Sequence, residues 1–340
     1  MNDKRKDASK IQELQKTQIE ENEKHVQTIQ NIQNSLVTNN QPINGSDDDE
    51  RPYRSIVQLW KVMHVYPPTA QECKNKDNND ESYDSDESWY WYEQAHDHYD
   101  TQPATLQGML GGFANLSPHD LSSSEDFLLY IQKNILPNLK FDSVCDCGAG
   151  IGRITKGLFW KLPGFRKCDL IEGSALFLKQ AEIYLNKNVD CHIVTEETNN
   201  MDINLSGLPI CRLISKGLQD FYPVDVNYYD VVWIQWVIGY LHDYDCVSFF
   251  KRCSKALKDN GILCIKDNMI NSNFDNHRDR KNDEDAFILD REDSSITRSK
   301  AYLEAIIEES GCWTKVYEVK QEGFPKEIFP VWMMAFQVKR

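Results

Sequence analysis

The 340-residue chain has no aromatic residue before Tyr53, whereas Trp, Tyr and Phe recur from Trp89 onward. Apolar residues make up 40% of the chain, less than the roughly 45–50% of ordinary globular domains. Because the deficit falls at the N-terminal end, we expect a segment there that folds poorly, followed by a normal globular domain.

The ten cysteines include no C-x-x-C pair, the spacing of many zinc and redox sites. Cys145 and Cys147 lie on one face of a predicted strand, but two thiolates do not complete a zinc site. We therefore expect no metal. The start of the chain lacks the apolar core of a signal peptide, and no apolar run approaches the ~20 residues of a membrane span. Reduced thiols, no membrane partner, and a location in nucleus and cytoplasm are the corresponding expectations.

Basic residues are also scarce, with 38 Lys and Arg against 53 Asp and Glu, giving a net charge of −15. Nonspecific nucleic-acid binding depends on neutralising phosphates, so we expect no nucleic-acid partner. The acidity suits a partner with basic segments, although acidic residues that only maintain solubility explain it equally well.

Residues 1–87 are predicted to form a disordered acidic and polar extension with transient helix, whose partner the sequence does not identify. Its apolar residues at helical spacing are Ile19, Val26, Ile29 and Leu36. This stripe is shorter than the three or four heptads of a coiled coil. The acidic run at 47–50 indicates a break. A short apolar patch at 55–66 either docks on the main domain or binds a partner.

Residues 88–340 alternate between strand and helix patterns, which predicts an α/β, Rossmann-like domain with a seven-stranded, mostly parallel sheet. The expected strands are 141–147, 167–172, 211–216, 229–236, 261–266, 313–319 and 331–338. The expected helices are 120–136, 151–162, 175–185, 243–257 (capped by Asp243) and 295–310. An aromatic-rich helix at 89–100 is expected as a lid, and surface insertions near 186–208 and 271–285.

The strongest motif is Asp-Cys-Gly-Ala-Gly-Ile-Gly-Arg at 146–153, between the first expected strand and helix. Glycines there let the backbone turn sharply and approach a ligand, and ligands of open α/β sheets bind at the carboxyl ends of strands. A dinucleotide fingerprint requires Gly at 153, where this chain has Arg. Gly148 and Gly150 instead fit the pattern of nucleoside methyl donors, which predicts S-adenosylmethionine; the alternative is a glycine-rich turn that binds nothing.

Other strand ends supply the remaining donor contacts. Arg153 is a cation for the donor carboxylate, and Glu172, at the end of the second strand, accepts from the ribose hydroxyls. Leu218 and Gln219 follow the third strand and frame the adenine. Gln235 and Trp236 end the fourth strand and line the reacting centre, unless Trp236 is simple core packing.

Six stretches point to one family: GMLGGF (108–113), DCGAGIGRITK (146–156), GLQDF (217–221), YDVVWIQWVIGYL (229–241), NGILCIKDN (260–268) and ILDREDSS (288–295). From Trp89 to its end the chain resembles the eukaryotic protein N-terminal methyltransferases, which modify Xaa-Pro-Lys N-termini. The resemblance implies methyl transfer from S-adenosylmethionine to the free N-terminal amine of such proteins after Met removal.

Carried over by motif, the donor site is Gly148, Gly150, Arg153, Glu172, Leu218, Gln219 and Gln235. The substrate-binding residues are Tyr99, Leu110, Gly111, Trp236, Asp267, Asn268, Asp290 and Ser295. In these roles Leu110 and Gly111 line the channel for the first residue, and Trp236 packs on the proline. Asn268 bonds the substrate backbone, while Asp290 and Ser295 hold the lysine.

The catalytic residues implied are Asp293 as general base, Asn268 and Tyr240. The family generally has His where this chain has Tyr240, Trp at Tyr99 and Asp at Glu172. A phenol with a pKa near ~10 is a poor base. An α-amine with a pKa of about 7.7–8 is partly neutral already, so Asp293 could suffice.

Three readings therefore stand beside one another. The first is the N-terminal methyltransferase. The second is a methyltransferase acting on another amine, and the third a donor-binding module that recognises N-termini with weak catalysis, which Tyr240 alone supports. Without the resemblance, Asp290 and Asp293 would be an exposed acidic loop followed by a helix cap at Ser294 or Ser295.

Overall fold

A computed structural model of the protein describes residues 2–63, 91–185, 190–194, 209–223, 225–270 and 285–340. Most of both expected insertions, and the linker after the apolar patch, lie outside these ranges. In the described part no helix is long and apolar enough to cross a bilayer.

The main sheet has the order β11-β12-β8-β7-β3-β4-β6-β5. Its strands are β3 (Ser143–Cys147), β4 (Lys167–Glu172), β5 (Asp190–Val194), β6 (Ile210–Ser215), β7 (Tyr229–Gln235), β8 (Leu257–Asn268), β11 (Trp313–Lys320) and β12 (Val331–Val338). The pairings are parallel except that β12 runs antiparallel to both its neighbours. The seven expected strands are confirmed, and β5 adds an eighth at the edge, inside a stretch expected to be an insertion.

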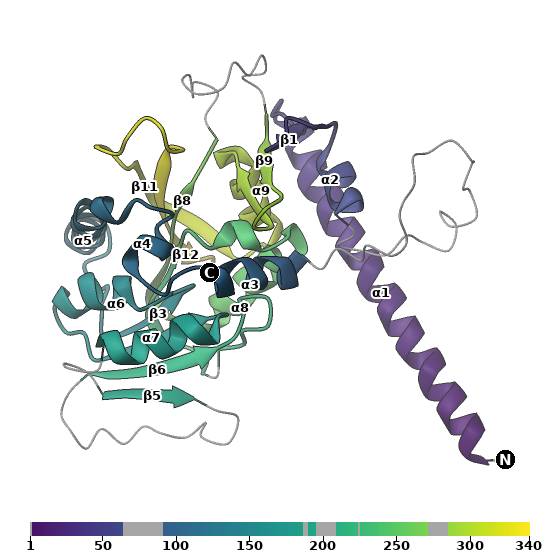
Figure 1. Cartoon of the computed structure of the whole chain (residues 1–340), viewed down its shortest axis with the longest axis horizontal. Coiled ribbons are helices and arrows are strands. Elements are labelled where there is room, and N and C mark those ends of the chain that lie inside the picture. The colour runs from purple at the N-terminus through teal and green to yellow at the C-terminus, as the bar shows by residue number, and fades with distance from the viewer. Residues whose placement is uncertain (1, 64–90, 186–189, 195–208, 224, 271–284) are drawn as a thin grey trace.

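Helices cover both faces of this sheet (Figure 1). They are α5 (Ser117–Asn134), α6 (Arg153–Gly157) with the 3-10 turn η2 (Phe159–Lys161), α7 (Ala175–Leu185), α8 (Asp243–Ala256) and α9 (Lys300–Glu309). In β7, Val231 and Trp233 belong to the core under α5, α6 and α7, whereas Val232 and Ile234 belong to the core under α8 and α9. This two-sided burial explains why the strand is a continuous apolar run.

Two local predictions are wrong. Residues 295–310 do not form one helix, because β10 (Ser295–Arg298) pairs with β9 (Phe287–Asp290) and α9 begins only after Ser299, whose side chain accepts from the Tyr302 amide. The cap of α8 is His242, which accepts from the Asp245 amide. Asp243 is instead buried among side-chain donors.

The N-terminal extension is more ordered than expected over the residues described. It forms α1 (Asn2–Thr38), β1 (Gly45–Asp47), β2 (Pro52–Tyr53) and α2 (Ile56–Val62), all on one side of the domain (Figure 1). The apolar residues of α1 and α2 that are buried in the domain core are Ile29, Ile32, Leu36, Ile56, Leu59 and Trp60. A helical stripe too short to be stable alone becomes stable when it packs against a core. The described part of the apolar patch, residues 55–63, thus docks on the main domain.

The strands β1 and β2 join a second, small sheet of order β10-β9-β1-β2. The sequence did not predict this sheet, because its N-terminal strands are three and two residues long and carry no alternating apolar pattern. Four further elements complete the described fold: α3 (Trp91–Thr101), which confirms the expected aromatic helix, α4 (Leu106–Met109) and the 3-10 turns η1 (Ala114–Leu116) and η3 (Ile238–Tyr240).

Candidate active site

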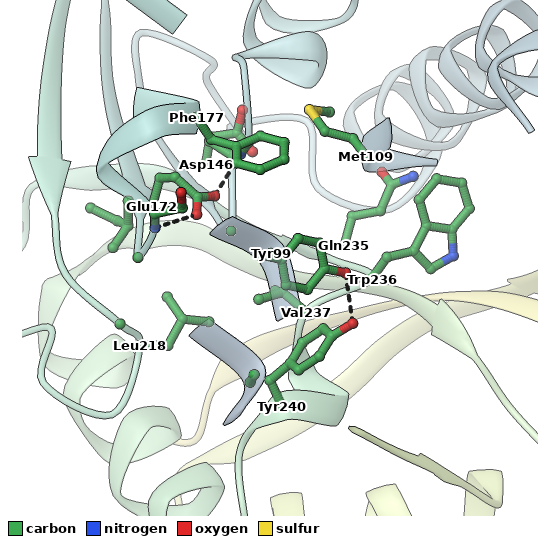
Figure 2. Close-up of a pocket in the computed structure, with 18 of the residues that line it drawn as sticks. Tyr99, Met109, Asp146, Glu172, Phe177, Leu218, Gln235, Trp236, Val237 and Tyr240 are labelled. Carbon is green, nitrogen blue, oxygen red and sulfur yellow. Dashed lines mark hydrogen bonds between the residues drawn. The ribbon is translucent and has the colours of Figure 1, made fainter. Parts of the chain in front are cut away.

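A cavity of about 230 Å³ opens where the carboxyl ends of β3, β4 and β7 face helix α3 (Figure 2). The expected site residues that line it are Tyr99, Leu110, Gly148, Gly150, Arg153, Glu172, Leu218, Gln219, Gln235, Trp236 and Tyr240. Six others lie outside its lining, namely Gly111, Asp267, Asn268, Asp290, Asp293 and Ser295. The structure therefore gathers every expected donor residue around one cavity.

The glycine-rich turn wraps one wall of the cavity in a backbone conformation that only glycine adopts easily. Gly148 and Gly150 have φ angles of 66° and 55°, in the left-handed region. A Cβ on Gly148 would lie 2.5 Å from a methyl carbon of Val237. Asp146, at the end of β3, accepts from the Thr155 amide and hydroxyl at 3.1 and 2.7 Å, which ties the turn to α6.

Glu172 is anchored to this turn through both carboxylate oxygens. Its Oε2 accepts from the Gly150 amide and its Oε1 from the Ser174 amide, each at 2.8 Å. Burial raises the pKa of Glu172, while these amide bonds oppose the rise. Each oxygen keeps a second lone pair, so the fixed carboxylate can still accept from a vicinal pair of hydroxyls.

Arg153 is held by a buried carboxylate that the sequence analysis missed. Its Nη1 lies 2.6 Å from Asp120 Oδ2, and both side chains are almost fully buried. Lys266 Nζ lies 2.6 Å from Asp120 Oδ1, and Gln235 Nε2 donates to both oxygens at 3.0 Å. The two cations lower the pKa of Asp120 against the effect of burial. A single acid thus fixes Arg153 and Gln235, while the guanidinium has further donors for a carboxylate.

Trp236 lies in the cavity wall next to Arg153. It is half-buried and lines the cavity, so it is not simple core packing. Its φ of 53° is unusual for a bulky residue. The Arg153 guanidinium lies 5.4 Å from the indole centre, and the Phe324 ring lies 6.5 Å away at a tilt of 33°. Strained residues of this kind cluster at binding sites.

Two tyrosine hydroxyls in the cavity lining and one carboxyl group outside it are joined by hydrogen bonds. The hydroxyls of Tyr99 and Tyr240 are 2.6 Å apart (Figure 2), and Tyr240 donates to Asp293 Oδ2 at 2.8 Å. Burial raises the pKa of Tyr99 to about 12 and that of Tyr240 well above 10, so both stay neutral. Burial also raises the pKa of Asp293, which makes it a better base. Within the described residues its Oδ1 has no hydrogen-bond partner.

Asp293 lies in the turn of the β9–β10 hairpin, between the two residues expected to hold a lysine. Asp290 and Ser295 face each other in the strand register. Ser294 between them has a φ of 54° and is fully buried. The expected alternative of an acidic loop followed by a helix cap at Ser294 or Ser295 is wrong, because a strand begins at Ser295.

The end of β8 carries Asp267 and Asn268. Asp267 is buried, its Oδ1 accepts from the Asn268 amide at 2.7 Å, and burial raises its pKa to about 6. The pair lies on the strand next to Gln235 and Trp236, although outside the cavity lining. On the far side of the cavity, Leu110 lines it whereas Gly111 is exposed with a φ of 52°.

Several lining residues carried no sequence signal that we used. Met109 packs on the glycine turn, where its sulfur accepts from the Ile151 amide at 3.1 Å. Phe177 of α7 adds an apolar wall. Asp120 could have been noticed as an acid on the buried face of an otherwise apolar helix stripe, but its partners lie 33, 115 and 146 residues away.

These side chains form a binding site whose chemistry fits S-adenosylmethionine. A carboxylate for the ribose, a guanidinium for the carboxylate and an apolar wall of Ile171, Phe177 and Leu218 surround the same cavity. No group of three or more His, Cys, Asp or Glu suitable for a metal occurs within the described ranges.

Comparison with known proteins also indicates a methyltransferase that uses S-adenosylmethionine. A family model described as an AdoMet-dependent proline di-methyltransferase matches residues 87–337. The alpha N-terminal protein methyltransferase 1 of Dictyostelium discoideum is 34% identical over 297 residues, covering 87% of this chain and 91% of the relative. The N-terminal Xaa-Pro-Lys N-methyltransferase 1 of Homo sapiens is 35% identical over 247 residues, covering 73% and 95%.

A solved structure supports the same fold and the same methyl donor. A SAM-dependent methyltransferase from Leishmania major superposes with a TM-score of 0.65 at 32% identity, covering 87% of this chain and 97% of that one. The family model spans more than half of the chain, and the relatives exceed 30% identity. The chain therefore belongs to the family of AdoMet-dependent proline di-methyltransferases.

Proposed function

We propose that this enzyme transfers methyl groups from S-adenosylmethionine to the free N-terminal amine of proteins that begin Xaa-Pro-Lys. The names of its relatives support this substrate, and one observation in the structure carries it. The half-buried carboxylate of Asp293 accepts a hydrogen bond from Tyr240, which lines the cavity, and lies between an acid and a serine that face each other on a hairpin. Nuclear and cytoplasmic residence remains part of the proposal.

The donor would be held by Glu172, Arg153 and Gln235, and when bound it supplies an electrophilic methyl group. The protein has to present a neutral amine in line with that methyl group, because correct positioning of the reacting groups lowers the barrier to such a displacement. An α-amine with a pKa of about 7.7–8 is deprotonated in part at neutral pH. Asp293 accepts the remaining proton at its carboxylate, whose raised pKa suits the task.

Recognition of the first three residues follows from the walls of the site. Trp236 offers a flat, half-buried face for a proline ring, which is stiff and apolar. Asp290 is the exposed last residue of β9, where its carboxylate can pair with a lysine ammonium group. Tyr240 orients the base and takes no proton itself, because its hydroxyl stays neutral.

A series of three short peptides tests the proposal. With S-adenosylmethionine, the chain should methylate a peptide beginning Ser-Pro-Lys, and replacing Pro by Ala or Lys by Gln should each lower kcat/KM by about tenfold or more, as expected for one lost contact of about 1.4 kcal/mol. Equal rates on the three peptides would show that neither proline nor lysine is recognised.

A further inference from the structure

The β9–β10 hairpin carries Asp290, Asp293 and Ser295, yet it is a two-stranded unit that is not part of the main sheet. An isolated hairpin is marginally stable in water. Among the described strands β10 pairs only with β9, apart from one backbone bond from the Ile270 amide to Arg298 O, and the other edge of β9 is occupied by β1 of the N-terminal extension. The extension therefore supplies the strands that turn the hairpin into a four-stranded sheet.

The junction between extension and hairpin is closely bonded. Backbone bonds run from the Ala286 amide to Asn44 O at 2.7 Å and from the Asp48 amide to Leu289 O at 3.0 Å. The Asn44 side chain donates to Asp285 Oδ1 at 3.0 Å. These bonds run from the two residues before β9 to Leu289, the residue before Asp290.

Gly45 makes this approach possible. It pairs with Phe287, and a Cβ at Gly45 would lie 2.4 Å from the Phe287 carbonyl oxygen. Any side chain at this position must push β1 away from β9. The following turn is held by Asp47, a fully buried carboxylate that accepts from the Tyr53 hydroxyl at 3.3 Å, and Arg291 of the hairpin donates to the same hydroxyl at 3.5 Å.

A second contact of the extension reaches the turn that carries Tyr240. The indole N–H of Trp60 donates to Asp243 Oδ2 at 2.8 Å, and Asp243 Oδ1 accepts from Arg298 at 2.9 Å. Arg298 in turn donates to Leu241 O at 2.7 Å, immediately after Tyr240. All the residues joined by this series of hydrogen bonds are buried.

Trp60 also supports the helix that covers the cavity. Its ring meets the edge of Trp91 with 5.2 Å between centres, and the Trp91 indole donates to the Tyr240 carbonyl at 2.5 Å. Thus β1 supports the segment carrying Asp293, while Trp60 supports the segment carrying Tyr240. Asp293 and Tyr240 are the two partners of one hydrogen bond of 2.8 Å. The extension therefore supports both ends of the bond that orients the base.

We propose that residues 44–63 are a positioning element of the substrate site, which holds the Asp293 hairpin and the Tyr240 turn in register for the peptide. The inference rests on the proposed function, and it assigns a role to a segment that precedes residue 87, where the family model begins. The donor half of the cavity is built on β3, β4 and β7 of the main sheet. None of these strands pairs with β1 or β2 of the positioning element. Loss of the element should therefore affect the peptide and spare the donor.

The test uses full-length Gly45→Ala and Trp60→Phe, with Val37→Ala as the matched control. Val37 lies in the same extension but is 52% exposed. We expect Gly45→Ala to raise the KM for a Ser-Pro-Lys peptide by about tenfold, because small misplacements of reacting groups are costly. Trp60→Phe keeps an aromatic ring but loses the N–H, and should lower kcat severalfold. The Kd for S-adenosylmethionine should not change in any variant.

Hydrogen exchange separates the possible failures. Amides of residues 287–298 should exchange faster in Gly45→Ala than in Val37→Ala, whereas amides of β3 and β4 should not. If the wild type methylates the peptide but both variants keep its KM and kcat, or if the hairpin amides are unchanged, the inference is wrong and the proposed function stands. If the wild type methylates no such peptide, the proposed function fails, and hydrogen exchange alone decides whether the element holds the hairpin. A Gly45→Ala chain that does not fold leaves the decision to Trp60→Phe.

Discussion

The Tyr240 hydroxyl donates a hydrogen bond across 2.8 Å to Asp293 Oδ2, joining two segments 53 residues apart in the chain. The phenol stays neutral and the carboxyl is partly buried, so the bond has a fixed direction. Where the family generally has a histidine, this chain thus places a donor that aims the base instead of a second base. Asp293 alone is then left to take a proton.

Asp293→Asn removes the base while keeping its shape. We expect kcat to fall about 10²–10⁴-fold, the usual contribution of a general base. The Kd for S-adenosylmethionine, measured by titration calorimetry, should stay within twofold, because Asp293 is not among the residues that line the cavity. A variant that kept wild-type kcat would show that the amine loses its proton elsewhere.

Tyr240→Phe removes the hydrogen bond to Asp293 and should change the pH profile. The bond favours the ionised carboxylate and so lowers its pKa. Without it the pKa of Asp293 rises further, and the acid limb of kcat against pH moves to higher pH. We expect kcat at neutral pH to fall by about tenfold, as for a hydrogen bond to a charged group. An acid limb unmoved or displaced to lower pH contradicts the assigned direction.

Asp290→Asn tests the lysine contact. On a Ser-Pro-Lys peptide the KM should rise roughly 10-fold, the effect of losing a charge-assisted contact. On a Ser-Pro-Gln peptide the same variant should resemble the wild type. A KM that rises equally on both peptides would mean that Asp290 supports the hairpin and does not bind lysine.

Glu172→Gln tests the donor site. The amide keeps one acceptor oxygen, but it loses the charge and places an NH₂ against a backbone amide that now donates to Oε1 or Oε2. We expect the Kd for S-adenosylmethionine to rise about 10- to 100-fold, the effect of losing charged hydrogen bonds. Glu308→Gln, on the exposed side of α9, is the matched control. Comparable affinity in both variants would exclude Glu172 as the ribose acceptor.

Much of the main sheet and the donor site could be predicted from the sequence. The central strands β3 and β7 are buried along their whole length, so they read as largely apolar runs. The carboxyl ends of parallel strands meet at one edge of the sheet. Gly148, Glu172 and Gln235 therefore gather at one cavity, because they lie at or just after the ends of three separate strands. The local sequence pattern was enough to predict this site, because the alternation of strands and helices by itself places the strand ends at one edge of the sheet.

The remainder depends on contacts between distant residues. The small sheet was missed because Gly-Ser-Asp and Pro-Tyr have no apolar alternation: the first pairs with β9, and the second pairs with β1. Pairing with the opposite edge of β9 makes residues 295–298 a strand, where the sequence predicted the start of a helix. Asp120 has meaning only through Arg153 and Lys266, which lie on other elements. No single stretch of sequence contains these relationships.

The most direct test of the function is the mass of two peptides after incubation with the chain and S-adenosylmethionine. Both begin Ser-Pro-Lys, and one carries an acetylated N-terminus, which removes the free amine but keeps the lysine. We predict that the free peptide alone gains mass, in steps of one methyl group. Gain on both peptides would place the methyl group on lysine, and gain on neither, with the donor still bound, would contradict the account.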